Sequence, residues 1–171
     1  MACVRNASEA DIDAITSIYA HYVRHNAATF EIEPPDTAEM DRRRSSSISR
    51  GLPYIVAEVE SEVAGYAYAS PYRLRPAYRF TVEDSVYIHP NLLGRGLGRL
   101  LLSHLIEDCE ARCYRQMVAI IGDTGNTASI RLHQALGFRM VGTLEGVGRK
   151  FDRWVDTVIM QRPLHAAIDG S

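Results

Sequence analysis

Residues 81–102 read TVEDSVYIHPNLLGRGLGRLLL, and the predicted fold is arranged around them. Its first part contains Val82, Val86 and Ile88, and β-branched residues of this kind favour a β-strand. The strand is expected to end at His89-Pro90, because proline has no backbone N–H to donate to a neighbouring strand. Apolar residues at helical spacing follow in the last part and predict a helix. The stretch therefore predicts a strand, a glycine-rich turn and a helix, in that order.

The turn carries Gly94-Arg95-Gly96-Leu97-Gly98-Arg99. A helix that begins at such a turn leaves backbone N–H groups free, and its dipole favours an anion, typically phosphate. Arg95 and Arg99 add positive charge. A P-loop would need a Lys-Ser/Thr pair, and a dinucleotide fingerprint would need a glycine where Arg99 stands. We expect a phosphate site of another kind, and an ordinary turn between strand and helix is the alternative that stays open.

Composition limits the kinds of partner. A single domain over residues 1–164, with a tail at 165–171, is expected from a chain of 171 residues. The formal net charge of −2 gives no electrostatic reason to expect nucleic acid or an anionic membrane as a partner. No apolar run approaches the roughly 20 residues that span a bilayer. The first residues, MACVRNASEAD, lack the apolar core of a secretion signal.

The cysteines indicate a reducing compartment. Cys3, Cys109 and Cys113 are odd in number and do not form a disulfide framework, so a cytoplasmic protein is expected. Cys109 and Cys113 lie four residues apart on the predicted helix, at a spacing at which two side chains can share a ligand. No His or Cys nearby completes a metal set, so we expect buried free thiols and no metal.

The rest of the chain alternates between helical and strand periods, which favours one α/β domain. Ser8 to Asp11 reads as a capping box at a helix start, and Gly137 reads as a helix C-cap. Residues 60–62 are expected to join two strands as a hairpin. The further strands are expected at 4–5, 54–59, 63–69, 116–121, 138–141 and 154–160, and the further helices at 12–23, from 36 or 37 onward, and at 126–137.

Two segments carry a resemblance to a known family. Residues 126–138, NTASIRLHQALGF, resemble a signature segment of the GNAT N-acetyltransferases, and residues 94–99 resemble the pyrophosphate loop of that family. The resemblance implies a central, mostly antiparallel sheet of about seven strands flanked by helices. It also implies acetyl-CoA as cosubstrate, held where two strands splay. The residues that this implies as its contacts are Val86, Tyr87, Ile88, Gly94, Arg95, Gly96, Leu97, Gly98, Arg99, Asn126 and Ser129.

A narrower resemblance extends through about Leu164. The chain is similar to the phosphinothricin and methionine sulfone/sulfoximine acetyltransferases in several segments, and His133 stands where the superfamily usually has tyrosine. The resemblance implies a homodimer that acetylates a small amino acid analogue. Its carriers lie at 30–34, 56–59, 63–69, 70–78, 81–83, 133–138 and 154–156.

The chemistry of amine acetylation requires a group that takes a proton, because the amine attacks only as the free base. Glu83 is the candidate base, directly or through water, and it matches the catalytic glutamate of the family. A solvated acid paired with an arginine is the alternative. Asp84 is expected to face the other side of the strand. A backbone N–H within residues 86–88 is the candidate donor to the developing oxyanion. His133 either protonates the departing thiolate or forms a hydrogen bond in the core or to Glu83.

Substrate choice is expected to depend on the Arg- and Tyr-rich segment at 70–79. Arg73 and Arg75 suit a ligand with a carboxylate and a second polar group, because a guanidinium binds such oxygens in pairs. Phe30 and Tyr78 are the expected apolar walls. Ordinary surface arginines stay an alternative for these positions. The competing functions are acetylation of protein N-termini or lysines, and CoA binding without catalysis.

Overall fold

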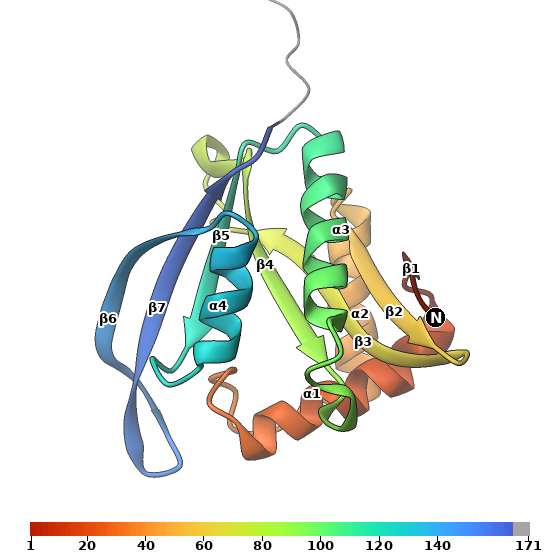
Figure 1. The fold of residues 1–171 in the computed structure, drawn as a ribbon, viewed down its shortest axis with the longest axis horizontal. Helices are drawn as coiled ribbons and strands as arrows, with labels where there is room; N and C mark the ends of the chain where they lie inside the picture. Colours follow the sequence, from red (N-terminus) through yellow and green to blue (C-terminus); the bar gives the residue numbers. More distant parts are fainter. Residues whose placement is uncertain (166–171) are drawn as a thin grey trace, which may run out of the picture.

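The computed structural model of the chain describes residues 1–165. These residues form a seven-stranded sheet in the order β1-β2-β3-β4-β5-β7-β6, shown in Figure 1. Only β4 and β5 pair in parallel, and every other neighbouring pair is antiparallel. The predicted mixed and mostly antiparallel sheet is confirmed. The strands are β1 (Ala2–Asn6), β2 (Tyr54–Val59), β3 (Glu62–Pro71), β4 (Thr81–Ile88), β5 (Gln116–Gly122), β6 (Arg139–Lys150) and β7 (Arg153–Pro163).

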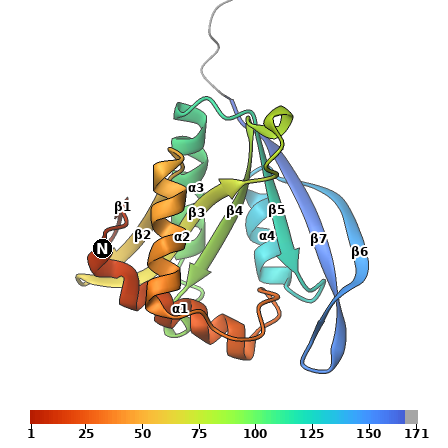
Figure 2. The same cartoon turned by 180° about the vertical axis from the view of Figure 1, so that it is seen from behind.

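Helices cover both faces of the sheet. Helices α1 (Ile12–His25) and α2 (Thr37–Ser49) lie on one face, and α3 (Leu97–Ala111) and α4 (Thr127–Ala135) lie on the other, as Figures 1 and 2 show from opposite sides. The apolar stripe of α1 packs on β2 and β3 beside a group of tyrosines, whereas the leucines of α3 pack against β2, β3 and β4. Two apolar cores therefore fix β4 between them.

The sheet opens at its centre. Thr81 to Asp84 of β4 pair with Gln116 to Ala119 of β5, and no pairing between these strands follows. Beyond Asp84, β4 continues beside β3 while β5 continues beside β7. The backbone groups of the last half of β4 that point away from β3 therefore have no strand partner, and the N–H groups among them can donate to a ligand.

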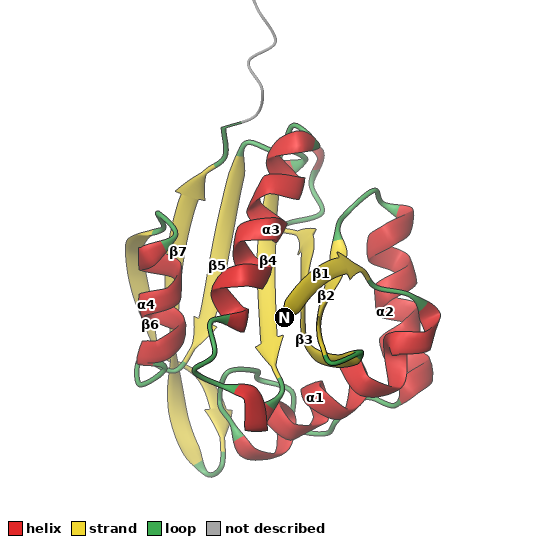
Figure 3. Ribbon diagram, turned by 45° about the vertical axis from the view of Figure 1, so that its right-hand side comes forward, coloured by secondary structure: helices red, strands yellow, loops and turns green. Residues whose placement is uncertain are grey.

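The β6–β7 hairpin is longer than the sequence predicts. Strand β6 reaches Lys150 and not residue 141, and the hairpin projects past the end of β5 (Figures 1 and 3). Glycines at 142, 146 and 148 weaken the local preference for a strand, and the register shifts at Met140/Gly142 and Leu144/Gly148 accommodate them. Pairing with β7, which the local sequence does not report, is what extends the strand.

Two turn predictions are confirmed and one prediction about the cysteines is partly wrong. Ser8 and Asp11 form the capping box, and a turn at Glu60 and Ser61 joins β2 to β3. All three cysteines are free, but only Cys109 is buried. Cys113 follows the end of α3 in a left-handed conformation (φ 64°), so it does not continue the buried face of the helix. No helix within residues 1–165 is long and apolar enough to cross a membrane.

Candidate active site

The glycine-rich turn has the geometry of an anion site. Gly96 is the N-cap of α3 at φ 78°, and Gly94 has φ 75°, a region that favours glycine. The N–H groups of the first helical turn have no partner within the helix. A Cβ on Gly98 would lie 3.2 Å from Cδ2 of Leu132, so glycine lets α3 approach α4 closely. The predicted strand, glycine turn and helix are therefore present.

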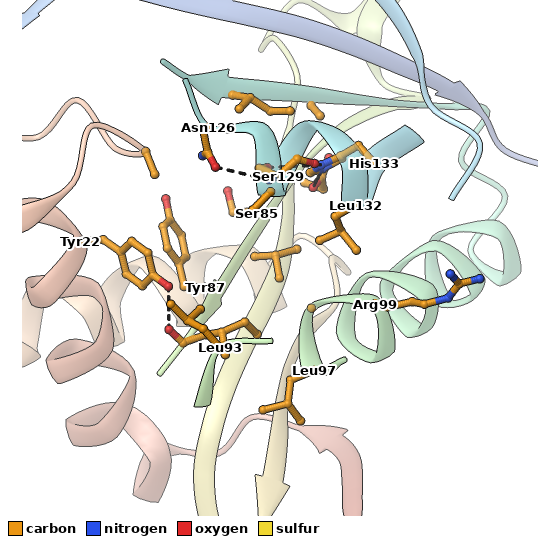
Figure 4. Close-up of a pocket in the computed structure, with 18 of the residues that line it drawn as sticks. Tyr22, Ser85, Tyr87, Leu93, Leu97, Arg99, Asn126, Ser129, Leu132 and His133 are labelled. Atoms are coloured by element: carbon orange, nitrogen blue, oxygen red, sulfur yellow. Dashed lines mark hydrogen bonds and ion pairs between the residues drawn. The ribbon is translucent and has the colours of Figure 1, made fainter. Parts of the chain in front are cut away.

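A cleft of about 470 Å³ lies where β4 and β5 separate. It extends from the glycine turn to α4, and Figure 4 shows its lining side chains arriving from α1, β4, α3 and α4. All the predicted acetyl-CoA contacts except Arg95 line this cleft. They are Val86, Tyr87, Ile88, Gly94, Gly96, Leu97, Gly98, Arg99, Asn126 and Ser129.

Helix α4 presents its N-terminus and His133 to the cleft. Oδ1 of Asn126 accepts from the backbone N–H of Ser129 at 3.3 Å and caps the helix. One turn further, Nδ1 of His133 lies 2.7 Å from the Ser129 carbonyl oxygen, which requires a proton on Nδ1. Asn126 thus has a structural task besides any contact with a ligand.

His133 pairs with Asp84 and not with Glu83. Nε2 of His133 is 2.8 Å from Oδ2 of Asp84, and both side chains are buried. Burial by itself lowers the pKa of His133, but the charge and hydrogen bond of Asp84, together with the Ser129 carbonyl, outweigh burial and raise it. The arrangement suits an imidazolium that donates from both ring nitrogens. Its role as an acid in catalysis stays a prediction.

Glu83 faces the tyrosines on the opposite side of β4. Burial, with a smaller contribution from the charge of Asp84, raises the pKa of Glu83 to about 7. Tyr68 of β3 pairs with Ser85, two residues along β4 from Glu83, so the two side chains are diagonal neighbours on one face of the sheet. Burial raises the pKa of Tyr68, and the charge of Glu83 raises it further. Among residues 1–165 no ion pair involves Glu83. Its carboxyl group is thus poised to exchange a proton near neutral pH.

The structure separates the predicted substrate residues from the cleft. Arg73, Arg75 and Tyr78 line a second hollow of about 210 Å³, which Thr81 and Val82 at the start of β4 also line. Phe30 lines neither cavity; its ring lies over Gly148, where a Cβ would come within 2.5 Å of Cε2. The roles of these four residues therefore stay predictions.

Sequence reasoning missed several lining residues. Tyr22, Asn26 and Ala28 come from the end of α1 and the segment after it, and the hydroxyl of Tyr22 donates to the Ile88 carbonyl at 2.7 Å. Ser85 lines the cleft beside the predicted residues of β4, and its place on that strand was a usable signal. The end of β5, at 119–122, also contributes. Nothing local in the sequence indicates that α1 reaches this place.

The described residues contain no candidate metal site. No three His, Cys, Asp or Glu side chains within residues 1–165 lie close enough together to hold an ion. Cys109 is buried and Cys113 is exposed, so the two thiols lie in different environments.

Comparison with known proteins agrees with this geometry. Residues 15–138 match the family model described as the acetyltransferase (GNAT) family. The chain is 55% identical to a phosphinothricin N-acetyltransferase of Alcaligenes faecalis, over 95% of this chain and 83% of that protein. It is 43% identical to an L-methionine sulfoximine/L-methionine sulfone acetyltransferase of Salmonella typhimurium, over 98% of each chain.

A solved structure agrees as well. The phosphinothricin acetyltransferase of Sinorhizobium meliloti, in complex with acetyl-CoA, superposes with a TM-score of 0.94 at 46% identity, over 99% of this chain and 92% of that chain. The family model covers more than half of the chain, and the relatives cover nearly all of it. The chain therefore belongs to the GNAT acetyltransferase family and is an N-acetyltransferase.

Proposed function

We propose that this enzyme transfers acetyl from acetyl-CoA to the α-amino group of a small amino acid analogue of the phosphinothricin, methionine sulfone or methionine sulfoximine type. The observation that carries the proposal is Glu83, a partly buried carboxyl group with a pKa of about 7 on the strand that leads into the cleft. The names of the similar enzymes support the substrate class.

The residues of the cleft fit acetyl-CoA. The free N–H groups at the start of α3, with Arg99 beside them, suit a pyrophosphate. The unpaired last half of β4 offers backbone donors to the acyl end of the ligand. Acetyl-CoA supplies the acetyl group as a thioester, which an amine can attack without a covalent enzyme intermediate.

Glu83 accepts the proton that the substrate ammonium must lose, directly or through a water molecule. A carboxylate of ordinary pKa would be a weak base for this task, and the raised pKa brings Glu83 closer to neutral pH. His133, held by Asp84 and the Ser129 carbonyl, supplies positive charge next to the cleft. That charge favours the departing thiolate whether or not His133 gives up a proton.

Arg73, Arg75 and Tyr78 are the proposed selectors of the amino acid. Their hollow includes Thr81 and Val82, which directly precede Glu83 in the chain. None of the ion pairs among residues 1–165 involves these two arginines, so both stay available to anionic oxygens. We therefore propose that they bind the carboxylate and the second polar group of the substrate.

A free-thiol release assay with acetyl-CoA and a panel of amines tests the substrate class. Methionine sulfone, methionine sulfoximine or phosphinothricin should be turned over well ahead of spermidine or a lysine peptide. Arg75→Ala should raise the KM for the amino acid tenfold or more and leave the Kd for acetyl-CoA unchanged. Faster turnover of the peptide would favour the protein acetyltransferase function, and no turnover of any amine would favour a CoA-binding module.

We also propose that the enzyme is a cytoplasmic homodimer in which the β6–β7 hairpin meets a second copy. The hairpin is the edge of the sheet and exposes Val141, Leu144, Val147 and Trp154, the last to 68%. Exposed edge strands with apolar side chains usually need cover. Three free cysteines suit a reducing compartment.

Trp154, the only tryptophan of the sequence, reports on this contact. Light scattering should give the dimer mass for the wild type and the monomer mass for Trp154→Glu. Leu74→Glu, which alters an exposed apolar side chain of the β3–β4 segment, should stay dimeric. Dilution of the wild type should shift the Trp154 emission to longer wavelength. A monomer mass for the wild type would contradict the dimer.

A further inference from the structure

Lys150 is the only lysine among the 19 basic side chains of the sequence; all the others are arginines. It stands at the end of β6, directly before the turn at Phe151 and Asp152. Unlike most lysines it is buried, with 4% of its surface exposed. Burying an ammonium group costs free energy unless the group has hydrogen-bond partners, so the partners of Lys150 indicate its role.

The partners of Lys150 lie 121 and 124 residues away in the chain. Nζ donates to the carbonyl oxygens of Asn26 and Thr29, each at 2.7 Å. Asn26 is the C-cap of α1, where the helix dipole places partial negative charge. Burial lowers the pKa of Lys150, and the charge of Glu31 opposes that shift. A compact ammonium suits two converging carbonyls better than a planar guanidinium does.

Glycines bring the same loop, residues 26–30, against the sheet. A Cβ on Gly122, at the end of β5, would collide with the carbonyl oxygen of Ala27. A Cβ on Gly148, two residues before Lys150, would lie 2.5 Å from the ring of Phe30. The loop thus lies on β5 and β6 at two places where only glycine fits, and Lys150 binds it at a third.

This loop forms a wall of the active site. Asn26 and Ala28 line the cleft. Within the loop, Oγ1 of Thr29 lies 2.7 Å from the hydroxyl oxygen of Tyr19. The Tyr19 ring packs edge-on against Tyr87, with the ring centroids 5.2 Å apart, and Tyr87 shares its face of β4 with Glu83. The loop therefore ends beside the side of β4 from which Glu83 would meet the amine.

We propose that Lys150 is a positioning residue that holds residues 26–30 against β5 and β6 and so shapes the site for the amine. The inference rests on the proposed function, because it takes the amine to bind beside Glu83. Lys150 lines neither the cleft nor the second hollow, so its loss should weaken amine binding more than it slows the chemistry.

Lys150→Met removes the charge and the donors at nearly constant length. The KM for the best amino acid should rise tenfold or more while kcat changes less than threefold and the Kd for acetyl-CoA less than threefold. Lys150→Arg keeps a cation and donors and should have a KM at least threefold below that of Lys150→Met. Hydrogen exchange at residues 26–30 should accelerate in Lys150→Met. Wild-type KM with wild-type exchange there would overturn the proposal.

A matched pair of glycine variants tests the same loop without touching Lys150. Gly148→Ala should displace Phe30 and raise the KM for the amine, whereas Gly142→Ala on the same strand, where a Cβ meets open space, should not. If Lys150→Met does not fold, equal KM values for these two variants would overturn the proposal. If the wild type acetylates no amino acid, the proposed substrate class is wrong. The hydrogen-exchange rates at residues 26–30 still test whether Lys150 holds this loop in place.

Discussion

Nε2 of His133 lies 2.8 Å from Oδ2 of Asp84, and this buried pair joins α4 to β4 at the point where the sheet opens. Asp84 is the last residue of β4 that pairs with β5. One turn of α4 away, the Ser129 carbonyl holds the other ring nitrogen. The pair therefore fixes two walls of the cleft relative to each other.

Removal of Asp84 should be strongly destabilising. Asp84→Ala leaves a buried imidazole without its counter-charge, and breaking a buried pair typically costs about 3–5 kcal/mol. Because the pKa of His133 is raised in the folded state, the stabilisation is fully present below its unfolded value, about 6.5. It is lost as the pH rises through the folded pKa. Urea unfolding of both proteins at several pH values measures this difference.

Asp108→Ala provides the comparison, because Asp108 pairs with Arg112 on the surface of α3. Exposed pairs of this kind contribute roughly 0–1 kcal/mol. Equal losses in the free energy of unfolding for the two variants would mean that the Asp84–His133 pair stabilises the fold no more than a surface pair does.

Glu83→Gln should lower kcat by roughly 10²–10⁴ at neutral pH, the usual worth of a general base. In the wild type, kcat/KM should rise with pH through about 7, because the carboxyl group must lose its proton to act as a base. Glu83→Gln should lack the rise centred near pH 7 and should gain activity only at higher pH, as free amine becomes abundant. The loss relative to the wild type should therefore shrink at high pH. Steady-state kinetics from pH 6 to 9 measures both effects. Near-normal activity over this range would exclude Glu83 as the base.

Glu83→Gln, which should lower activity, should raise the stability of the folded protein above pH 7. A carboxyl group whose pKa is about 7 in the folded state and 4.5 otherwise stabilises the fold most below pH 4.5. That contribution is lost as the pH rises to about 7. Glu83→Gln should therefore be more stable than the wild type above pH 7, by about 1–3 kcal/mol. A loss of stability there would contradict the raised pKa.

Tyr66→Phe should be neutral or stabilising by about 1 kcal/mol. Tyr66 is fully buried, and within residues 1–165 its hydroxyl has no hydrogen-bond partner. Removing a buried polar group that lacks a partner removes its desolvation cost. Tyr22→Phe, in contrast, removes the hydroxyl that donates to the Ile88 carbonyl and should cost about 1 kcal/mol. Thermal unfolding of the two variants distinguishes them, and an equal loss in both would contradict this reasoning.

Gly98→Val should weaken acetyl-CoA binding tenfold or more. Even a Cβ at this position meets Leu132 at 3.2 Å, so a larger side chain must move the start of α3 away from α4. Gly142→Val, where a Cβ meets open space, is the control. Calorimetry measures the Kd of both variants. Unchanged affinity in a folded Gly98→Val protein would mean that the turn does not bind the pyrophosphate.

The elements that depend on local residue order are predictable from the sequence alone. The strand, glycine turn and helix of residues 81–102, the capping box at Ser8 and the apolar stripe of α1 are all present. Each depends on neighbours within a few residues, where side-chain spacing and turn chemistry act directly. The family signature in residues 126–138 belongs to the same class, because it lies on one helix and its ends.

Which of these elements contact each other depends on long-range packing, and the sequence pattern does not reveal it. Asp84 and His133 are 49 residues apart in the chain, Tyr22 and Ile88 are 66 apart, and Lys150 binds a carbonyl 124 residues away. Periodicity reports that a helix has a buried face, but it does not report which element that face contacts. The length of β6 and the separation of Arg73 and Arg75 from the cleft both follow from long-range pairing and packing. Those interactions outweigh local preference once the sheet has formed.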